Sequence, residues 1–436
     1  MFNKLITYAS MGIGAVIANY RGDIGEPSSI GTYQLNVDNS TYANADMIHT
    51  THYHVDWKVD FNTEQLIGSI THDLEVLTDT NILVMDSWGN IISSVEMLHP
   101  GSAKCMRDQC SNDIIYSGYP LTWSVDVVNP IIGDQLTINF PDIHKAGESL
   151  SVRIWYATNQ ESQAMSWLKP SQTSGGVLPY IYTQCEDINC RSVAPLMDTP
   201  SNRITYSARV IHSNQLVAKM SANETIVEKY NGTHSQTRFR CDIPIPNYLM
   251  ALAVGDLVYR STGYRTGVIS EPSQIDAIAT ELEDMGELLD MVEAYAGDYI
   301  WGNYTIIILP PSFPMGGMEN PLLTFASPTI IVGDKSQVYV ATHEMAHSWT
   351  GNTITCSNWE SFWLNEGWTV FIERKVSAAL YGEDFALVEA FLGNNSLWTD
   401  MVANGGVNST YASLHPVLKG DNPDNSFSEV PYEKGF

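Results

Sequence analysis

The chain has 436 residues, of which 44% are hydrophobic, and it contains 11 tryptophans and 22 tyrosines. A chain of this length and composition can fill two or three hydrophobic cores, which fits a soluble enzyme. The formal net charge of −27 argues against nucleic acid or an anionic membrane as a partner. An acidic field favours cationic substrates, although solubility alone would also explain the charge.

The first 18 residues have the pattern of a secretory signal peptide. Lys4 gives one positive charge, about fourteen uncharged residues follow, and cleavage is expected after about Ala18. The stretch is short for a membrane span, and an uncleaved anchor or a simple N-terminal extension are the alternatives. We therefore expect a secreted or extracytoplasmic protein, with a cytoplasmic location as the alternative. Residues 19–52 are rich in Gly, Ser, Asn and Thr without periodicity, which predicts a linker or mobile arm.

Hydrophobic side chains recur at every second position in several runs of residues 53–257, and Asn, Gly and Pro turns separate these runs. The alternating residues are Val55, Trp57, Val59 and Phe61 in one run and Leu150, Val152, Ile154 and Tyr156 in another. The pattern predicts a large antiparallel β-domain at the N-terminal side. Cys105 and Cys110 flank a short polar turn in this domain and can form a disulfide if the compartment is oxidising.

The periodicity changes after Pro272. Leu282, Met285, Leu289 and Val292 recur at helical spacing, and further strands and helices follow. Residues 258–436 are therefore predicted to form a second domain of mixed α and β structure. The sequence shows no internal repeat and no nucleotide-binding glycine loop.

The most informative motif is HEMAH at residues 343–347. Positions i and i+4 share one helix face, so His343 and His347 can both reach one tetrahedral metal ion. Glu366, after eighteen intervening residues, would be the third ligand. Two imidazoles and one carboxylate leave a fourth position for water, whose proton Glu344 would take as general base. A surface helix with two histidines is the alternative, but this composition produces the motif by chance with a probability of only about 1–2%.

The residues around Glu366 have the apolar spacing of a second helix, so two packed helices would share the ion. Glu373 follows Glu366 by two turns on the same face of that helix. It could accept a hydrogen bond from a ligand histidine, and a solvated glutamate is the equal alternative.

A glycine-rich segment precedes the metal motif, after a predicted strand at residues 304–309 and a proline-rich turn. Its candidate substrate-binding residues are Gly316, Gly317, Met318, Glu319 and Asn320. Glycines let a backbone come close to a substrate. A metallopeptidase that removes single residues must bind a free α-ammonium, and the fixed carboxylate of Glu319 can do so by charge-assisted hydrogen bonding. Taken alone, the segment could be an ordinary turn.

These motifs resemble the exopeptidase and zinc motifs of the gluzincin aminopeptidases, and more specifically the leukotriene-A(4) hydrolase and aminopeptidase B branch. The stretches that resemble this branch are residues 182–185, 190–191, 310–321, 343–352, 362–373 and 430–436. The similarity runs from about the middle fifties to the last residue. It implies a thermolysin-like zinc metallopeptidase fold for the second domain, and Tyr432 as the hydrogen-bond donor to the oxyanion of the tetrahedral intermediate.

Members of this branch continue beyond the position of Phe436, through the rest of the catalytic domain and a C-terminal helical domain. We therefore expect the second domain to be incomplete and the chain to be a fragment of a longer protein. A shortened variant with an open cleft is the alternative.

Four positions in the substrate pocket bear on the choice of substrate. By the resemblance, Gln184 and Asp424 match residues of the S1 pocket. The branch's hydrolase has a glutamine where this chain has Glu186, and a second tyrosine where this chain has Phe427. These differences argue against leukotriene chemistry and make the pocket more acidic, which favours basic N-terminal residues.

The prediction is a zinc aminopeptidase with one Zn²⁺ per chain, which acts on peptides with a free N-terminus and prefers basic residues. A lipid-epoxide hydrolase on the same zinc and a catalytically impaired binding module are the alternatives. No nucleic-acid partner and no membrane span after signal cleavage are expected.

Overall fold

The computed structural model describes residues 38–99, 118–418 and 420–436, and residues 38–436 belong to one compact unit. The predicted signal peptide, residues 19–37 of the predicted linker, and Cys105 and Cys110 lie outside the described residues, so these expectations stay predictions. Among the residues that are described, no helix is both long and apolar enough to cross a membrane.

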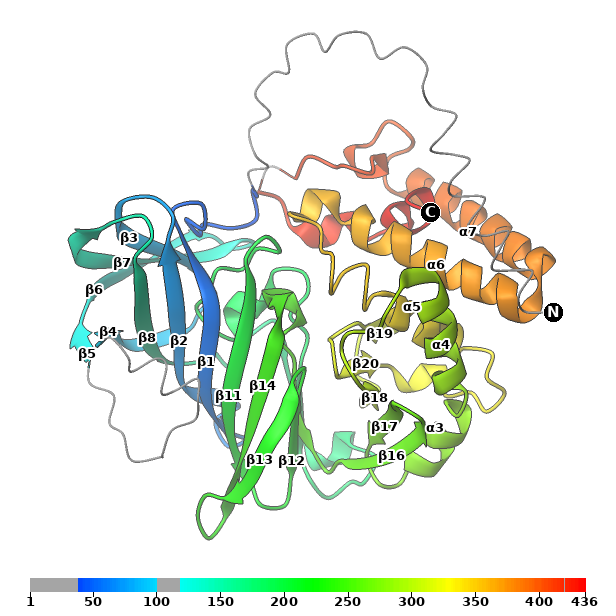
Figure 1. Ribbon diagram of the computed structural model, residues 1–436, viewed down its shortest axis with the longest axis horizontal. Coiled ribbons are helices and arrows are strands. Elements are labelled where there is room, and N and C mark those ends of the chain that lie inside the picture. Colours follow the sequence, from blue (N-terminus) through cyan, green and yellow to red (C-terminus); the bar gives the residue numbers. More distant parts are fainter. Residues whose placement is uncertain (1–37, 100–117, 419) are drawn as a thin grey trace. The chain divides into compact units, whose positions relative to one another are not determined.

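The first domain is built almost entirely of strands (Figure 1). Its largest sheet has eight strands in the order β13-β14-β11-β1-β2-β8-β4-β5, and smaller sheets have the orders β3-β7-β6 and β12-β15-β10-β9. The strands are β1 (Ile48–Asp60), β2 (Gln65–Val76), β3 (Thr80–Ser87), β4 (Ile91–Leu98), β5 (Gly118–Pro120), β6 (Thr122–Asn129), β7 (Gly133–His144), β8 (Ser149–Ala157), β9 (Met165–Leu168), β10 (Tyr180–Thr183), β11 (Arg203–Ser213), β12 (Val217–Met220), β13 (Asn223–Lys229), β14 (His234–Pro246) and β15 (Leu252–Gly255).

The alternating pattern of the sequence is realised in β1 and β8, whose buried residues face one core. Trp57 and Tyr156, one from each strand, are buried, and the indole Nε1 donates to the phenol oxygen at 2.7 Å. The predicted fold class, an N-terminal β-domain followed by a mixed α and β domain, is confirmed. The sheet departs from the antiparallel expectation at one pair, since β1 and β11 run parallel, with His52 beside Thr205.

Residues 38–52 are ordered, where the composition had predicted a linker or mobile arm up to residue 52. Strand β1 already begins at Ile48, and the segment before it is held by side chains from distant strands. The backbone N–H of Tyr42 donates to Asp86 Oδ1 at 2.7 Å, and Val84 N–H donates to Asn44 Oδ1 at 2.8 Å. These hydrogen bonds are tertiary, so the local composition of the segment could not indicate them.

The second domain begins with a five-stranded sheet in the order β16-β17-β18-β20-β19. Its strands are β16 (Val258–Gly263), β17 (Thr266–Ser270), β18 (Tyr304–Ile308), β19 (Gly317–Met318) and β20 (Thr324–Ala326). Strands β17, β18 and β20 are parallel, while β16 and β19 pair antiparallel with their neighbours. The glycine-rich segment therefore lies on an edge strand of this sheet, next to β20.

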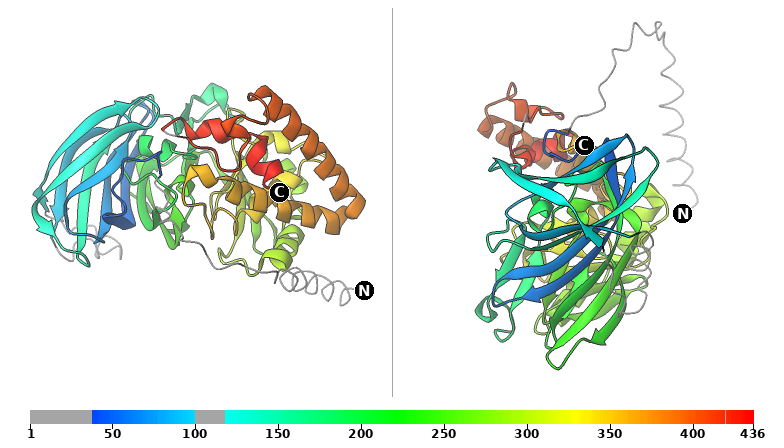
Figure 2. Two further views of the ribbon diagram at one scale, coloured as in Figure 1. Left: turned by 90° about the horizontal axis from the view of Figure 1, so that it is seen from above. Right: turned by 90° about the vertical axis from the view of Figure 1, so that its left-hand side faces the viewer.

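The helices of the second domain are α3 (Ile275–Glu281), α4 (Met285–Ala296), α5 (Tyr339–Ala346), α6 (Trp363–Tyr381) and α7 (Glu383–Ala403). Shorter helical turns are η1 (Pro170–Gln172), η2 (Asn189–Ser192), η3 (Asn247–Leu249), η4 (Pro328–Ile330), η5 (Trp359–Ser361), η6 (Thr410–Ala412), η7 (Pro423–Ser426) and η8 (Val430–Lys434). Helix α6 packs on α5 and on α7 (Figure 2). Of the apolar repeat that begins at Leu282, the later members Met285, Leu289 and Val292 all lie in α4, whereas Leu282 lies in the turn between α3 and α4.

Candidate metal centre

Three side chains from α5 and α6 bring their ligand atoms together. His343 and His347 lie one turn apart at the C-terminal end of α5, and their Nε2 atoms are 3.1 Å apart. Glu366, in the first turn of α6, places its Oε2 atom 3.3 Å from each of these nitrogens. The sequence spacing had predicted these three residues as one set, and the structure brings them to one point.

The remaining ring nitrogens are held by hydrogen bonds that define the tautomers. His343 Nδ1 lies 2.9 Å from Glu373 Oε2, and His347 Nδ1 lies 2.8 Å from the carbonyl oxygen of Thr350. Since a carboxylate and a carbonyl oxygen only accept, both Nδ1 atoms carry a proton, which leaves the two Nε2 atoms as the nitrogens that can bind a metal ion. The contact to Glu373 is the one that its helical spacing had suggested.

Against the effect of burial, Glu366 and the neighbouring carboxylates raise the pKa of both imidazoles, that of His347 to about 9, so the site favours positive charge among the three ligand atoms. Glu366 Oε2 has no hydrogen-bond partner among the described residues. Two nitrogens and one oxygen are the donor set that zinc takes in catalytic sites. The residues present therefore fit a zinc ion. Glu319, Glu344 and His347 form a second group whose ligand atoms lie within 4.8 Å of one another, but this group uses only one imidazole and suits zinc less well.

Glu344 is buried beside this donor set. Burial raises the pKa of Glu344 to about 8, against the lowering effect of the neighbouring histidines, so its carboxyl group can exchange a proton near neutral pH. Gly317 packs directly on it, because a Cβ atom at this position would lie 2.2 Å from Glu344 Oε1. Only glycine allows the edge strand β19 to pass this close to the carboxylate.

The carboxylate of Glu319, from the same glycine-rich segment, also turns toward the metal ligands. Glu319 is buried, its Oε1 has no partner among the described residues, and burial raises its pKa. Its backbone is fixed, since Asn352 Nδ2 donates to the Glu319 carbonyl at 2.8 Å. At the start of the segment, Ser327 N–H donates to the carbonyl of Gly316 at 2.9 Å. Asn320 and Met318 are buried in the turn and the edge strand.

Tyr432, in η8, lies next to one of the ligands. Its ring stacks on His343 at a centroid distance of 6.1 Å and an angle of 25°. Burial, followed by the charges of Glu366 and Glu186, raises the pKa of the phenol well above its ordinary value. The hydroxyl therefore keeps its proton and can donate a hydrogen bond throughout the neutral range.

Gln184 and Glu186 follow β10 and approach the glycine-rich segment. Gln184 Nε2 lies 3.0 Å from Met318 Sδ, which links this stretch to β19. Burial and the charges of Glu319 and Glu366 raise the pKa of Glu186, so its carboxyl group stands among the metal-side carboxylates. Asp424, in η7, is exposed and hydrogen-bonds to Asn422. No hydrogen bond or ion pair between Asp424 and the metal-side residues occurs in the described part of the chain.

Several residues of the site were not predicted from the sequence. Thr350 and Thr369 both contact His347 Nδ1, the first through its carbonyl and the second through its hydroxyl at 3.1 Å. Thr369 follows Glu366 by three residues, so its helical position could have indicated that it faces α5. Asp187, next to Glu186, is buried with one unpartnered oxygen. No periodicity or motif distinguishes Asp187 in the sequence.

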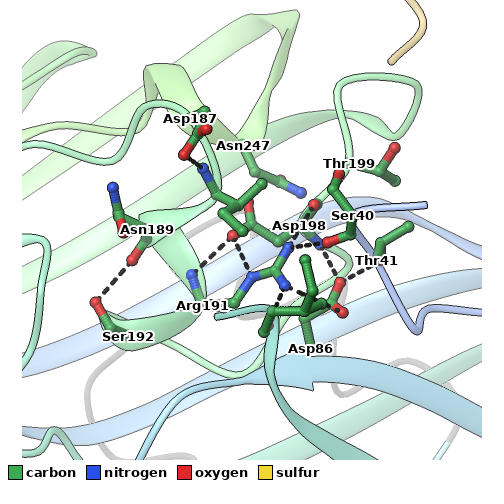
Figure 3. Close-up of polar contacts among 12 residues, drawn as sticks. Ser40, Thr41, Asp86, Asp187, Asn189, Arg191, Ser192, Asp198, Thr199 and Asn247 are labelled. Atoms are coloured by element: carbon green, nitrogen blue, oxygen red, sulfur yellow. Dashed lines mark hydrogen bonds and ion pairs between the residues drawn. The ribbon is translucent and has the colours of Figure 1, made fainter. Parts of the chain in front are cut away.

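A second buried polar group lies at the end of the same stretch, and we call it the Arg191 cluster (Figure 3). It consists of Ser40, Thr41, Asp86, Arg191 and Asp198. Arg191 in η2 donates from its backbone N–H and from Nε to Asp198 Oδ2, both at 3.0 Å, and from Nη2 to the Ser40 carbonyl at 2.8 Å. Thr41 and the backbone of Tyr42 donate to Asp86, which also pairs with Arg191. The cluster anchors the chain five residues after Glu186.

Two family models match this chain. The model described as the peptidase M1 N-terminal domain matches residues 49–249, and the model described as the peptidase family M1 domain matches residues 280–436. The first range falls within the β-domain. The second range contains the three candidate metal ligands and, in addition, Glu344, Glu319 and Tyr432.

Known proteins of similar sequence are longer than this chain. A leukotriene A-4 hydrolase from Xenopus laevis is 36% identical over 402 residues, which are 92% of this chain and 63% of that protein. A leucine aminopeptidase 2 from Yarrowia lipolytica is 38% identical over 408 residues, which are 91% of this chain and 58% of that protein. The chain therefore spans about three fifths of the length of the relatives that it matches.

Solved structures show the same fold. Leukotriene A4 hydrolase from Saccharomyces cerevisiae superposes with a TM-score of 0.82 at 31% identity, over 93% of this chain and 60% of that one. An M1 zinc metallopeptidase mutant from Deinococcus radiodurans, bound to a Tyr-Ser-Ala substrate, superposes with a TM-score of 0.69 at 19% identity, over 89% of this chain and 81% of that one. The second likeness concerns the fold alone.

Proposed function

Because this chain belongs to the M1 peptidase family, we propose that it is a zinc aminopeptidase, which removes single residues from the free N-termini of peptides. One observation carries the proposal. The Nε2 atoms of His343 and His347 and the Oε2 atom of Glu366 converge within 3.3 Å of one another, beside two further buried carboxylates, Glu344 and Glu319, that are not needed as ligands.

We propose that His343, His347 and Glu366 hold one Zn²⁺ per chain. When bound, zinc would polarise the scissile carbonyl and bring the pKa of an attacking water toward neutrality. Glu373 and Thr350 fix the two imidazole rings through Nδ1, which keeps both Nε2 lone pairs directed at the site and makes the histidines better ligands.

Glu344 and Tyr432 are the proposed proton-handling residues. With a pKa of about 8 in the metal-free protein, the Glu344 carboxyl group can accept a proton from the attacking water and return it to the leaving amine. The Tyr432 phenol, which stays protonated, would donate to the oxygen on which negative charge develops.

Glu319 is the proposed anchor for the α-ammonium of the substrate. Its carboxylate is buried, has an oxygen without a partner among the described residues, and stands beside the metal ligands. A fixed carboxylate in that place would limit cleavage to the first peptide bond. The backbone of residues 316–320 would lie alongside the substrate.

We further propose that the enzyme prefers basic N-terminal residues. Glu186 and Asp424 would offer carboxylates to the side chain of the first residue, and Gln184 an amide oxygen. A charge-assisted pair of this kind contributes roughly 1.5–3 kcal/mol, or about 10- to 150-fold in kcat/KM. Phe427 stacks on Phe362 at 4.3 Å and has no hydroxyl group, which supports a peptide over a lipid epoxide as the substrate.

N-acetylation of the substrate tests the exopeptidase proposal. The acetylated amine has no charge to pair with Glu319, so cleavage of an acetylated peptide should fall below detection while the free peptide is cleaved from its N-terminus. Mass spectrometry of the products distinguishes the two. Efficient cleavage of the acetylated peptide at an internal bond would contradict the proposal.

A further inference from the structure

The turn that follows α5, residues 351–355, lies between a metal ligand and the proposed anchor for the α-ammonium. A Cβ atom at Gly351 would lie 3.1 Å from His347 Nδ1 and 3.6 Å from Glu319 Oε1. Asn352, which is 1% exposed, donates from its backbone N–H to the His347 carbonyl at 3.0 Å and from Nδ2 to the Glu319 carbonyl at 2.8 Å. This turn therefore joins the backbone of the ligand to the backbone of the anchor.

The same turn is held from the first domain by Arg203, at the start of β11. Its Nη2 donates to the Asn352 carbonyl at 2.7 Å and to the Pro244 carbonyl in β14 at 2.5 Å, and its Nη1 donates to the Thr355 hydroxyl. The Thr355 hydroxyl donates in turn to the Gly351 carbonyl at 2.5 Å. Because a guanidinium offers its N–H donors in one fixed plane, Arg203 sets the position of the turn relative to the sheet.

These contacts of Arg203 differ in kind from those of Arg191. Arg191 pairs with two carboxylates, whereas the acceptors that Arg203 contacts are two carbonyls and a hydroxyl, all of them uncharged. Through these contacts Arg203 does not balance a buried carboxylate. It holds together two backbone segments, β14 and the 351–355 turn.

The support of the metal ligand does not depend on Arg203. The carbonyl of Thr350 accepts from His347 Nδ1, and Thr350 continues the last turn of α5, since its own N–H donates to a carbonyl of that helix at 3.3 Å. Thr369, on α6, contacts the same ring nitrogen at 3.1 Å. Loss of Arg203 should therefore loosen Glu319 without releasing a metal ion from His347.

We propose that Arg203 is a positioning residue for Glu319. Through Asn352 it holds the anchor carboxylate at the distance from the metal ligands that brings the first peptide bond of a substrate to the site. This proposal deepens the proposed aminopeptidase function and rests on it. An exopeptidase needs this distance to stay constant, because a displacement of about 1 Å near the reacting atoms can lower the rate about 100-fold. In this way the first domain contributes to the reaction, although β11 supplies no metal ligand.

Hydrogen exchange of the metal-free protein tests the positioning role without turnover. In Arg203→Met the turn loses its two hydrogen bonds to Arg203, so the backbone amides of residues 316–320 should exchange at least about fivefold faster than in the unchanged protein. Residues 258–263, in β16, are the internal reference, and their exchange should stay the same. Arg209→Met is the matched control, since Arg209 lies in the same strand and pairs with Asp56 inside the first domain.

The kinetics of a leucyl amide substrate separate positioning from a general loss of structure. Arg203→Met should raise KM about 5- to 20-fold, the effect of one or two net hydrogen bonds, while kcat changes less than about twofold and zinc is retained. Arg203→Lys keeps the charge and some of the donors, so its KM should lie between the other two values. In a Glu319→Gln background, Arg203→Met should lower kcat/KM by less than about twofold further, because its effect passes through Glu319.

Unchanged exchange of residues 316–320 in Arg203→Met would overturn the positioning role. Equal effects of Arg203→Met in the unchanged protein and in Glu319→Gln would overturn it too, because Arg203 would then act on the fold as a whole and not on the anchor. Failure of the aminopeptidase proposal looks different, since the unchanged protein would then cleave no leucyl amide, while the exchange of residues 316–320 would still respond to Arg203→Met.

Discussion

The Arg191 cluster and the metal-side carboxylates are both buried and charged, but they differ in how the charges are matched. In the Arg191 cluster, one guanidinium serves two aspartates and three backbone carbonyls, and Asp86 also accepts from the Thr41 hydroxyl and from the backbone of Tyr42. At the metal side, Glu186, Glu319, Glu344 and Glu366 each keep an oxygen that has no partner within the described residues.

The difference indicates that the Arg191 cluster stabilises the fold, whereas the metal-side carboxylates are suited to binding ligands. A matched cluster loses several interactions when any member is removed, so it fixes the position of the segments that meet there. A set of like charges without partners destabilises the free protein and becomes favourable only when cations bind. The two regions are joined by residues 184–191, so the stable cluster positions the reactive set.

The largest expected effect is that of Glu344→Gln. The amide cannot accept the proton of the attacking water, so turnover should fall about 100- to 10,000-fold. Because the change also removes one of several repelling buried carboxylates, the zinc-free variant should unfold at the same denaturant concentration as the unchanged protein, or at a higher one. Steady-state kinetics and urea unfolding in the presence of a chelator measure both. Glu383→Gln, at the exposed start of α7, is the control. A loss of stability in Glu344→Gln would contradict the view that the metal-side carboxylates destabilise the metal-free protein.

The opposite behaviour is expected for Arg191→Met. Removing the guanidinium leaves Asp86 and Asp198 buried without their cation, which should destabilise the protein by about 3–5 kcal/mol. The exposed pair of Arg240 with Asp242 provides the control, since Arg240→Met should change stability by at most about 1 kcal/mol. Unfolding curves in urea distinguish the two, and equal small effects would show that the Arg191 cluster does not hold the fold.

A smaller effect concerns His72, a buried residue of the β-domain between Thr50 and the carbonyl of Pro195. Burial lowers the pKa of His72 from 6.5 to about 3. The unfolded chain therefore binds a proton below pH 6.5 that the folded protein does not bind, and stability should fall from pH 6.5 down to about pH 3, by roughly 5 kcal/mol in total. Urea unfolding as a function of pH measures this loss. In His72→Gln the corresponding part of the slope should disappear, and an unchanged slope would exclude His72 as its source.

Most residues around the metal ligands could be predicted from the sequence because the spacing that identifies them is local. The i, i+4 spacing places His343 and His347 on one face of any helix, and Glu366 and Glu373 share one face of the next helix. Gly317 was predicted to let the backbone come close to a substrate, and the close approach that the structure shows is a different one, to a Glu344 oxygen. Tyr432 came only from resemblance to a family, since a single tyrosine near a turn has no local pattern.

What the sequence could not predict depends on contacts between distant segments. Residues 38–47 were predicted to be part of a linker because composition does not indicate tertiary contacts. In the structure, hydrogen bonds to strand β3, including those to Asp86, hold this segment in place. The parallel pairing of β1 with β11 joins segments more than a hundred residues apart. Asp187 was missed for the same reason, because only the folded structure shows that it is buried with one oxygen unpartnered among the described residues.

Zinc content tests the central claim most directly. After loading with zinc and removal of excess metal, the unchanged protein and Glu344→Gln should each retain one zinc ion per chain by mass spectrometry of the metal. His343→Ala and Glu366→Ala should retain almost none, while His415→Ala, which alters a largely exposed histidine, should keep the full amount. Stoichiometric zinc in His343→Ala, or its loss in Glu344→Gln, would contradict the assignment of ligands and base on which the proposed function rests.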